Sequence, residues 1–179
     1  MSDKPPVVTT WGKKGLTPII TSAGGWNNLS LLGMIIYIPC ADETDSLVWM
    51  QKSSVKKETI LRVLNDIKKR YEHCGHPLIV LWDGLPAHRA YAVRDFIRHN
   101  KHWLTVERFP AYAPELNPQE YGWSVLKRKT LGNYCPQTMR ALAQKARRGM
   151  RDMKKDSSVL KGFLKKSGLW SGKELCEGQ

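Results

Sequence analysis

The 179-residue sequence has few cysteines and no apolar run long enough to cross a membrane. Its longest apolar stretch, around residues 31–39, falls short of the roughly 18 residues that a bilayer span needs. No basic segment followed by an apolar run and a cleavage site opens the chain, so we expect no secretory signal. The 4 cysteines form no CxxC pair, which argues against a disulfide scaffold and a zinc ribbon. These absences predict a cytoplasmic protein without a membrane partner.

Acidic residues are also scarce. The chain has 16 Asp and Glu against 29 Lys and Arg, a net charge of +13 and a pI near 9.7. Residues 124–179 alone hold 14 Lys or Arg against 4 Asp or Glu. A strong basic excess favours a polyanionic partner, and nucleic acid is the first candidate.

The length and composition predict one compact domain. The chain is 41% apolar and 25% charged, with a mean hydropathy of −0.44, which is typical of a globular protein and excludes a fibrous or disordered one. Residues 171–179 carry little apolar content. We therefore expect a domain over residues 1–170, followed by a flexible tail over residues 171–179.

The basic part of the chain contains a helical pattern. Apolar residues from Met139 to Met153 recur at helical spacing, and cations fill most of the other positions. The pattern fits either an ordinary solvated helix surface or a DNA-binding surface, whose phosphate contacts would make binding salt-dependent. The candidate DNA-binding residues are Lys127, Arg128, Lys129, Arg140, Lys145, Arg147, Arg148 and Arg151.

The rest of the sequence predicts a mixed α/β fold. Residues 29–38 and 45–51 form an expected antiparallel hairpin, which a helix over residues 55–72 follows. The apolar run at residues 77–82 predicts a parallel strand buried on both faces. A helix over residues 86–99 and a strand over residues 103–109 complete a strand-helix-strand unit. A proline-rich loop then leads to a helix that begins at about Asn117.

Two carboxylates are candidates for chemistry. Asp83 directly follows the strand at residues 77–82, at the strand end where α/β sheets place their functional crevices, although an Asp before Gly84 is also a common turn signal. Glu120 falls in the first turn of a helix capped by Asn117, where it either complements the helix dipole or binds a ligand. If the two converge, their hard oxygen atoms suit Mg²⁺ or Mn²⁺.

Three segments carry a resemblance to a known family: TTWGKKGLTP at residues 9–18, LIVLWDGLPAHRA at residues 78–90, and FPAYAPELNPQEYGWSVLKR at residues 109–128. Together they resemble the catalytic domain of mariner-type DDE transposases, especially the bacterial insertion-sequence branch. The resemblance implies that Asp83 and Glu120 are two of three catalytic metal ligands. It also implies that Trp123 packs behind Glu120. His88 lies just after Asp83 at an expected helix start, where it either supports the ligand or acts as a surface cap, and Asn117 is a further candidate supporting residue.

The family fold implied by this resemblance is ribonuclease-H-like: a five-stranded mixed sheet with flanking helices. The expected elements match strands two to five. The family's first Asp, at the end of the central first strand, would fall about four residues before Met1, so the resemblance implies an N-terminally truncated domain whose first strand is largely missing. We therefore expect this chain alone to be poorly stable or weakly catalytic.

The resulting prediction is metal-dependent DNA cleavage and strand transfer in transposition. It includes two Mg²⁺ or Mn²⁺ ions where the triad is complete, transposon ends and target DNA as partners, a homodimer in the active complex, and association with the nucleoid. One alternative is a non-catalytic DNA-binding remnant that uses only its basic helices. Another is a cellular ribonuclease-H-like nuclease or resolvase, which would cut RNA hybrids or junctions.

Overall fold

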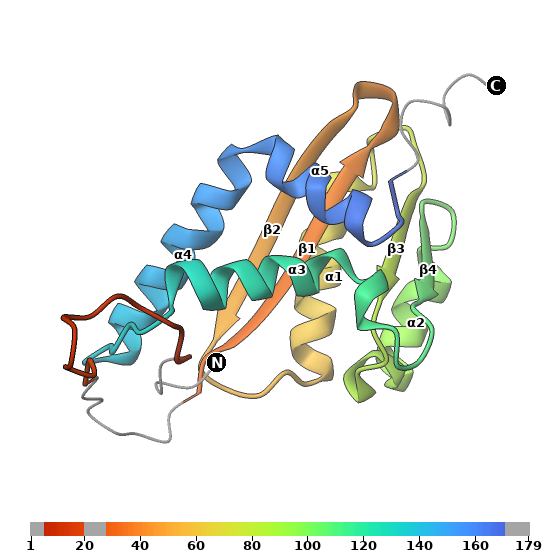
Figure 1. Cartoon of the computed structure of the whole chain (residues 1–179). Helices are drawn as coiled ribbons and strands as arrows, with labels where there is room; N and C mark the ends of the chain where they lie inside the picture. The colour runs from red at the N-terminus through yellow and green to blue at the C-terminus, as the bar shows by residue number, and fades with distance from the viewer. Residues whose placement is uncertain (1–5, 20–27, 171–179) are drawn as a thin grey trace. The chain divides into compact units, whose positions relative to one another are not determined.

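The structure, a computed structural model, describes residues 6–19 and 28–170 of the chain. These residues divide into two compact units (Figure 1). The first unit combines residues 1–53 with residues 118–179, and the second consists of residues 54–117. The predicted tail at residues 171–179 lies outside the described residues. In the described part of the chain, no helix has the length and apolar character of a membrane span.

The first unit contains the predicted antiparallel hairpin. Strand β1 (Ser30–Ile38) pairs with β2 (Glu43–Gln51) along its whole length, from Ser30 opposite Gln51 to Ile38 opposite Glu43. A 3₁₀ turn at Pro39–Ala41 joins the strands, and Asp42 completes the turn with a left-handed backbone (φ 51°). Asp is one of the few residues other than glycine that adopts this conformation readily. The hairpin prediction is confirmed.

Three helices pack on this hairpin (Figure 1): α3 (Pro118–Val125) contacts β1, and both α4 (Met139–Lys155) and α5 (Ser157–Lys166) contact β2. Side-chain caps begin the last two helices, because the oxygens of Thr138 and Asp156 accept backbone N–H bonds from their first turns. The buried core beneath the helices consists of Leu29, Leu126, Leu131, Leu142, Met150 and Met153.

Helix α3 runs directly into a π-helical turn at Leu126–Thr130. The N–H of Leu131 donates to the carbonyl oxygen of Leu126 at 3.0 Å, which closes the wider turn. Leu126 is 0% exposed and Leu131 is 3% exposed, so both ends of the turn are anchored in the core. The residues between them, at positions 127–129, are exposed.

The second unit is the predicted strand-helix-strand unit preceded by a helix. Helix α1 (Lys57–Tyr71) leads to β3 (Leu78–Trp82), and helix α2 (Tyr91–His99) connects β3 to the parallel strand β4 (Leu104–Arg108). Short 3₁₀ turns lie at Pro86–Arg89 and Pro114–Leu116. Its buried apolar residues include Ile60, Leu64, Ile67, Val93, Trp103 and Leu104.

Two predictions for this unit need correction. Strand β3 is not buried on both faces, because Ile79 is 64% exposed and Leu81 is 40% exposed while alternate residues are half-buried. The apolar run therefore does not indicate two covered faces. The helix expected over residues 86–99 is interrupted at Ala90, whose extended backbone (φ −58°, ψ 141°) separates the 3₁₀ turn from α2.

The mixed α/β fold is confirmed, and its four strands lie at the positions where the sequence predicts them. They form two sheets, β1–β2 and β3–β4, in place of one continuous sheet. Among the described strands, β1 and β3 are each paired along one edge only.

Candidate active site and nucleic-acid interface

Asp83 directly follows the carboxyl end of β3, as predicted. Its side chain is 60% exposed, and its Oδ1 atom accepts a hydrogen bond from the backbone N–H of Leu85 at 3.0 Å. This short turn holds the carboxylate beside the backbone. Part of the carboxylate remains open to solvent.

His88 lies against Asp83. Its Nδ1 atom is 3.1 Å from the backbone oxygen of Asp83 and 3.3 Å from its Oδ1 atom. Since both neighbours are acceptors, Nδ1 must carry the proton that bonds them. The imidazole stacks on the ring of Trp82 with centroids 4.1 Å apart and planes 3° apart, and only 11% of the side chain is exposed. His88 is therefore a buried partner that orients Asp83 and is not a surface cap.

These contacts set the charge of Asp83. The hydrogen bond from His88 lowers the pKa of this carboxyl below its ordinary value of 3.8, and the Leu85 N–H acts in the same direction. Partial burial opposes them but does not cancel them. Asp83 is thus a carboxylate at neutral pH, which is the form that binds a hard divalent cation.

Glu120 occupies the third position of α3 and is exposed. The two residues before it, Pro118 and Gln119, are buried. The Gln119 amide lies against Gly33 of β1 so closely that a Cβ atom on Gly33 would come within 2.6 Å of the amide carbon. The first turn of α3 is therefore packed onto β1, and Glu120 is presented from a fixed backbone.

The other predicted supporting residues flank Glu120 along the chain. The backbone at Asn117 is extended (φ −92°, ψ 105°), and α3 begins at the next residue, as expected of a helix start. Trp123, one turn after Glu120, is partly buried and packs against the core of the first unit. The predicted packing of Trp123 behind Glu120 stays a prediction.

The structure brings Asp83 into contact with His88. Glu120 and Trp123 lie on α3, and Asn117 directly precedes this helix. Asp83 belongs to the second unit and Glu120 to the first. Their convergence on a shared metal stays a prediction. Within the described residues, no three His, Cys, Asp or Glu side chains gather into a metal-binding group.

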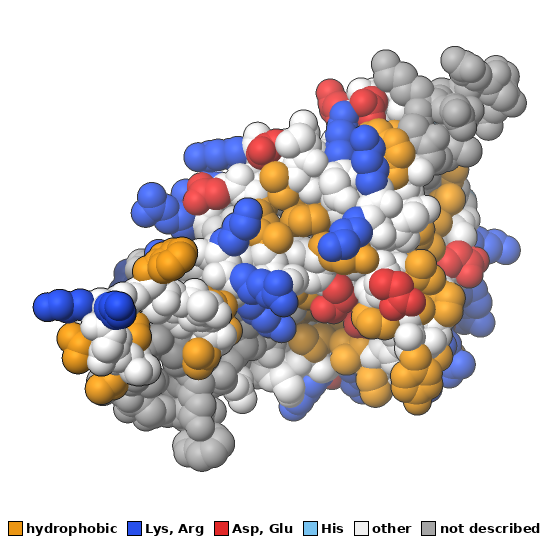
Figure 2. Space-filling model, in the orientation of Figure 1, with side chains coloured by type: hydrophobic (Ala, Val, Ile, Leu, Met, Phe, Trp, Pro, Cys, Tyr) orange, Lys and Arg blue, Asp and Glu red, His pale blue; other side chains and the backbone are white. Residues whose placement is uncertain are grey.

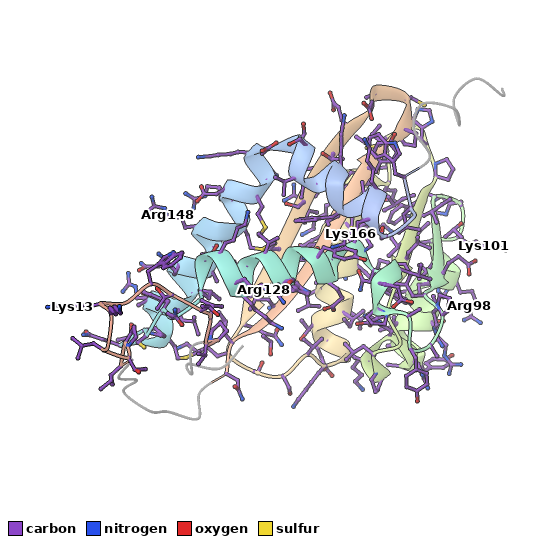
Figure 3. All side chains as sticks on the ribbon, in the orientation of Figure 1. Lys13, Arg98, Lys101, Arg128, Arg148 and Lys166 are labelled. Atoms are coloured by element: carbon purple, nitrogen blue, oxygen red, sulfur yellow. The ribbon has the colours of Figure 1, made fainter. Side chains whose placement is uncertain are left out.

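The predicted DNA-binding residues all belong to the first unit and are all exposed. Figure 2 shows Lys and Arg side chains spread over the face that carries α3, α4 and α5, and Figure 3 labels Arg128 and Arg148 there. Lys127, Arg128 and Lys129 project from the π turn, and the other five lie on α4. In the described part of the chain, none of them forms an ion pair.

Two features of the site were not predicted. The first is the stack of His88 on Trp82, since the sequence around these residues predicts only the end of a strand and a turn. The contact of Gln119 with Gly33 had one signal that the prediction did not use, since a glycine inside an apolar strand indicates close approach by another group. Both features hold the backbone or side chain beside a candidate ligand.

Comparison with known proteins identifies the family and the fold. Residues 1–142 match the family model described as DDE superfamily endonuclease. Among solved structures, the chain is similar to the catalytic domain of Mos1 mariner transposase, with a TM-score of 0.60 and 17% identity over 86% of this chain and 81% of that one. It is also similar to the Mos1 mariner paired-end complex with Mn, with a TM-score of 0.64 and 16% identity over 98% of this chain.

The chain spans 52% of the Mos1 chain in the paired-end complex and 51% of that in the Mos1 strand transfer complex. No curated protein matches the sequence. The structural likeness confirms the expected fold, and the family model covers most of the chain. The protein therefore belongs to the DDE superfamily endonucleases.

Proposed function

We propose that this chain is the catalytic domain of a DDE transposase, which cleaves DNA with divalent metal ions and joins the cut end to target DNA. The observation that carries the proposal is the placement of Asp83. It lies at the end of a β-strand, where the Leu85 N–H and the His88 ring hold its partly exposed carboxylate in place. Family membership and the fold support the same activity.

The donor chemistry fits a divalent cation of the Mg²⁺ or Mn²⁺ type. Asp83 offers carboxylate oxygen that is ionised at neutral pH, and Glu120 offers a second, exposed carboxylate from the first turn of α3. In our proposal, these two residues are metal ligands. When bound, the metal activates the attacking water and stabilises the leaving oxygen of the phosphodiester.

The chain's own residues have separate tasks in this proposal. His88 keeps the Asp83 carboxylate oriented, while the Gln119 contact with Gly33 fixes the turn that presents Glu120. The exposed cations of the π turn and α4 bind DNA phosphates, which position the duplex without reading its sequence. The proposed partners are transposon ends and target DNA, engaged by a homodimer associated with the nucleoid.

The direct test is DNA nicking in Mg²⁺ or Mn²⁺ by a chain to which the family's first Asp has been restored, measured on a labelled duplex that carries the transposon end. Asp83→Asn and Glu120→Gln should each reduce nicking at least about 100-fold, because each removes a charge from the metal site. Asp95→Asn is the matched control, since Asp95 lies on α2 and pairs with Arg98 at the surface. It should leave nicking unchanged.

Binding provides the second measurement. Both metal-ligand variants should retain salt-dependent DNA affinity, because the cations that contact phosphate are elsewhere. Nicking that persists in both variants would contradict the ligand assignment. DNA binding without nicking by any version of the chain would favour the non-catalytic alternative, and sedimentation with end DNA tests the homodimer.

A further inference from the structure

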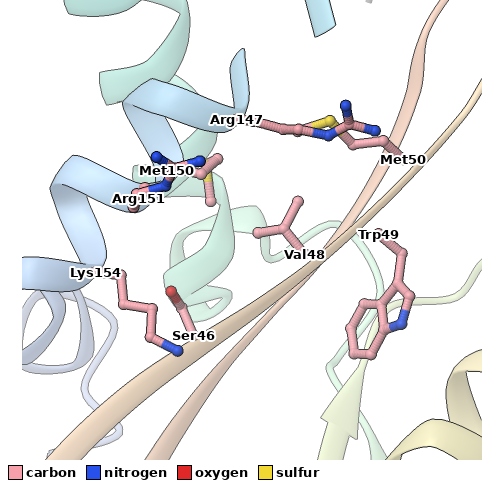
Figure 4. A pocket seen from close by; sticks show the side chains of 8 residues that line it. All are labelled: Ser46, Val48, Trp49, Met50, Arg147, Met150, Arg151 and Lys154. Carbon is pink, nitrogen blue, oxygen red and sulfur yellow. The ribbon is translucent and has the colours of Figure 1, made fainter. Parts of the chain in front are cut away.

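A groove lies between β2 and α4 in the first unit, and the candidate active site does not use it. Its volume is about 430 Å³, within the range of pockets that hold small ligands. Figure 4 shows Ser46, Val48 and Met50 pointing from β2 towards α4, while Trp49 points to the opposite face of the strand. Met150 of α4 completes an apolar floor.

Cations line the other wall of the groove. Arg147, Arg151 and Lys154 lie on one face of α4, with spacings of four and three residues. An apolar floor beside a row of cations suits a ligand that has both an apolar part and an anionic part. A purely polar ligand would leave the floor unused.

The ion pairs distinguish structural cations from available ones. Lys154 pairs with Asp45 of β2 at 2.7 Å, which ties α4 to the strand at one end of the groove. In the described residues, neither Arg147 nor Arg151 has an acidic partner, and both are exposed. Their charge is therefore open to a ligand.

We propose that this groove binds an unpaired nucleotide of single-stranded DNA, with its phosphate on Arg147 and Arg151 and its base over Val48, Met50 and Met150. This rests on the proposed function in taking DNA as the partner. It goes beyond that function in assigning a site for single strands. The axial rise between Arg147 and Arg151 is about 6 Å, so the two guanidinium groups can serve neighbouring positions along one strand.

The chemistry favours a nucleotide over a paired duplex. A duplex presents its phosphates and sugars outward and keeps its bases stacked inside, so it would contact the arginines but not the floor. A single strand exposes both groups to a protein groove. The basic excess of this part of the chain, 14 Lys or Arg against 4 Asp or Glu over residues 124–179, favours nucleic acid over other amphipathic anions.

The test measures selectivity for single strands over duplex. Fluorescence anisotropy gives the affinity of the full chain for a labelled 12-nucleotide thymidine strand, for the same backbone with abasic sites, and for a 12-base-pair duplex. The variants are Arg151→Gln and Arg147→Gln/Arg151→Gln. Arg148→Gln is the matched control, because it removes the same charge from α4 outside the groove.

Arg151→Gln should lower the ratio of single-strand to duplex affinity about fivefold or more, since Arg151 would hold the phosphate of the groove-bound nucleotide more closely than it holds a duplex phosphate. Arg148→Gln should lower both affinities by a similar factor and leave the ratio unchanged. Removing the bases should weaken binding to the wild-type chain. That loss should shrink below about twofold in the double variant.

The proposal would be overturned if Arg151→Gln and Arg148→Gln had the same ratio of single-strand to duplex affinity. It would also be overturned if the wild-type chain bound the thymidine strand and the abasic strand with equal affinity. Displacement of the thymidine strand by an acidic peptide, with no ratio change in Arg151→Gln, would assign the groove to a peptide. These measurements need neither metal nor cleavage. A chain that nicks DNA but shows no ratio change refutes this inference alone, and an inactive chain with the ratio change refutes only the proposed function.

Discussion

Gly149 provides a sharp test of how closely α4 packs on the π turn. In a helix interior, glycine is about 1 kcal/mol less favourable than alanine, so Gly149→Ala would stabilise the protein if space were available. Space is not available here. A Cβ atom on Gly149 would lie 2.5 Å from Thr130 Oγ1, 2.6 Å from Thr130 Cγ2 and 2.9 Å from Leu126 Cδ1.

The magnitude follows from what surrounds that position. Thr130 has a short, stiff side chain, and Leu126 is 0% exposed, so neither moves aside without disturbing the core. Overpacking of this kind costs about 1–3 kcal/mol, which exceeds the gain in helix propensity. We expect Gly149→Ala to lower the free energy of unfolding by about 1 kcal/mol.

Gly162 of α5 is the matched control. It is also in a helix interior, but apart from its chain neighbours and the nearby backbone of its own helix, no atom lies within 4 Å of the position that its Cβ would take. Gly162→Ala should therefore raise the free energy of unfolding, by up to about 1 kcal/mol. Urea denaturation followed by circular dichroism measures both variants, and their difference should be about 2 kcal/mol, well outside the error of the comparison.

A double-mutant cycle identifies the contact responsible. Thr130→Ala removes both Thr130 atoms that a Gly149→Ala methyl group would meet, so the two substitutions should cost less together than the sum of their separate costs. A stabilising Gly149→Ala, or additive costs in the cycle, would refute the close approach of α4 to the π turn.

Three further variants test other contacts. His88→Ala should raise the pKa of Asp83 towards 3.8, because the substitution removes the hydrogen bond that lowers this pKa. An NMR titration of the Asp83 carboxyl in the wild-type and variant proteins measures the change. An unchanged pKa would contradict the contact between His88 and Asp83. The pKa of Asp83 is lower in the folded protein than in the unfolded chain, so its ionised carboxylate stabilises the fold above pH 3.8, and this stabilisation is lost as the pH falls through the folded-state pKa. Urea titrations at several pH values should therefore show a smaller loss of unfolding free energy at acid pH for His88→Ala than for the wild-type chain. Thr138→Ala should cost about 1 kcal/mol, because the Thr138 hydroxyl caps α4 by accepting from the Ala141 N–H at 3.1 Å, whereas Thr138→Ser should retain most of the stability. Leu64→Ala should cost about 2–5 kcal/mol, because Leu64 is 2% exposed in the core of the second unit; a cost below 1 kcal/mol in chemical denaturation would contradict its burial.

The sequence predicts the local elements well, because their signals are local. Apolar runs on either side of a turn specify the hairpin, and helical spacing from Met139 to Met153 specifies the buried face of α4. The strand at Leu78–Trp82 and its following Asp83 are also predicted at the correct positions. The apolar content of that strand exceeds its burial, which is why the prediction of two covered faces was wrong.

The contacts that hold the candidate ligands are harder to predict. Gly33 and Gln119 meet although they lie far apart in the sequence, and no periodic pattern encodes that contact. His88 stacks on Trp82 from a 3₁₀ turn that ends at Ala90, where the sequence predicts a continuous helix, so the pattern gives no signal for this contact. The predicted pairing of Asp83 with Glu120 rests on family resemblance and stays a prediction, because neither spacing nor charge in the sequence alone identifies the partner.

The π turn after α3 has a consequence for insertions and deletions in this chain. Two residues five positions apart in an uninterrupted α-helix point about 140° away from each other, so Leu126 and Leu131 could not both face one core. The wider turn accommodates one additional residue and lets both leucines do so. Deleting a single residue between them would leave the leucines four positions apart, about 40° from each other around an ordinary α-helix, so both would still face the core. We therefore expect this segment to tolerate the loss of one residue, whereas a deletion elsewhere in α3 would turn a buried side chain to solvent.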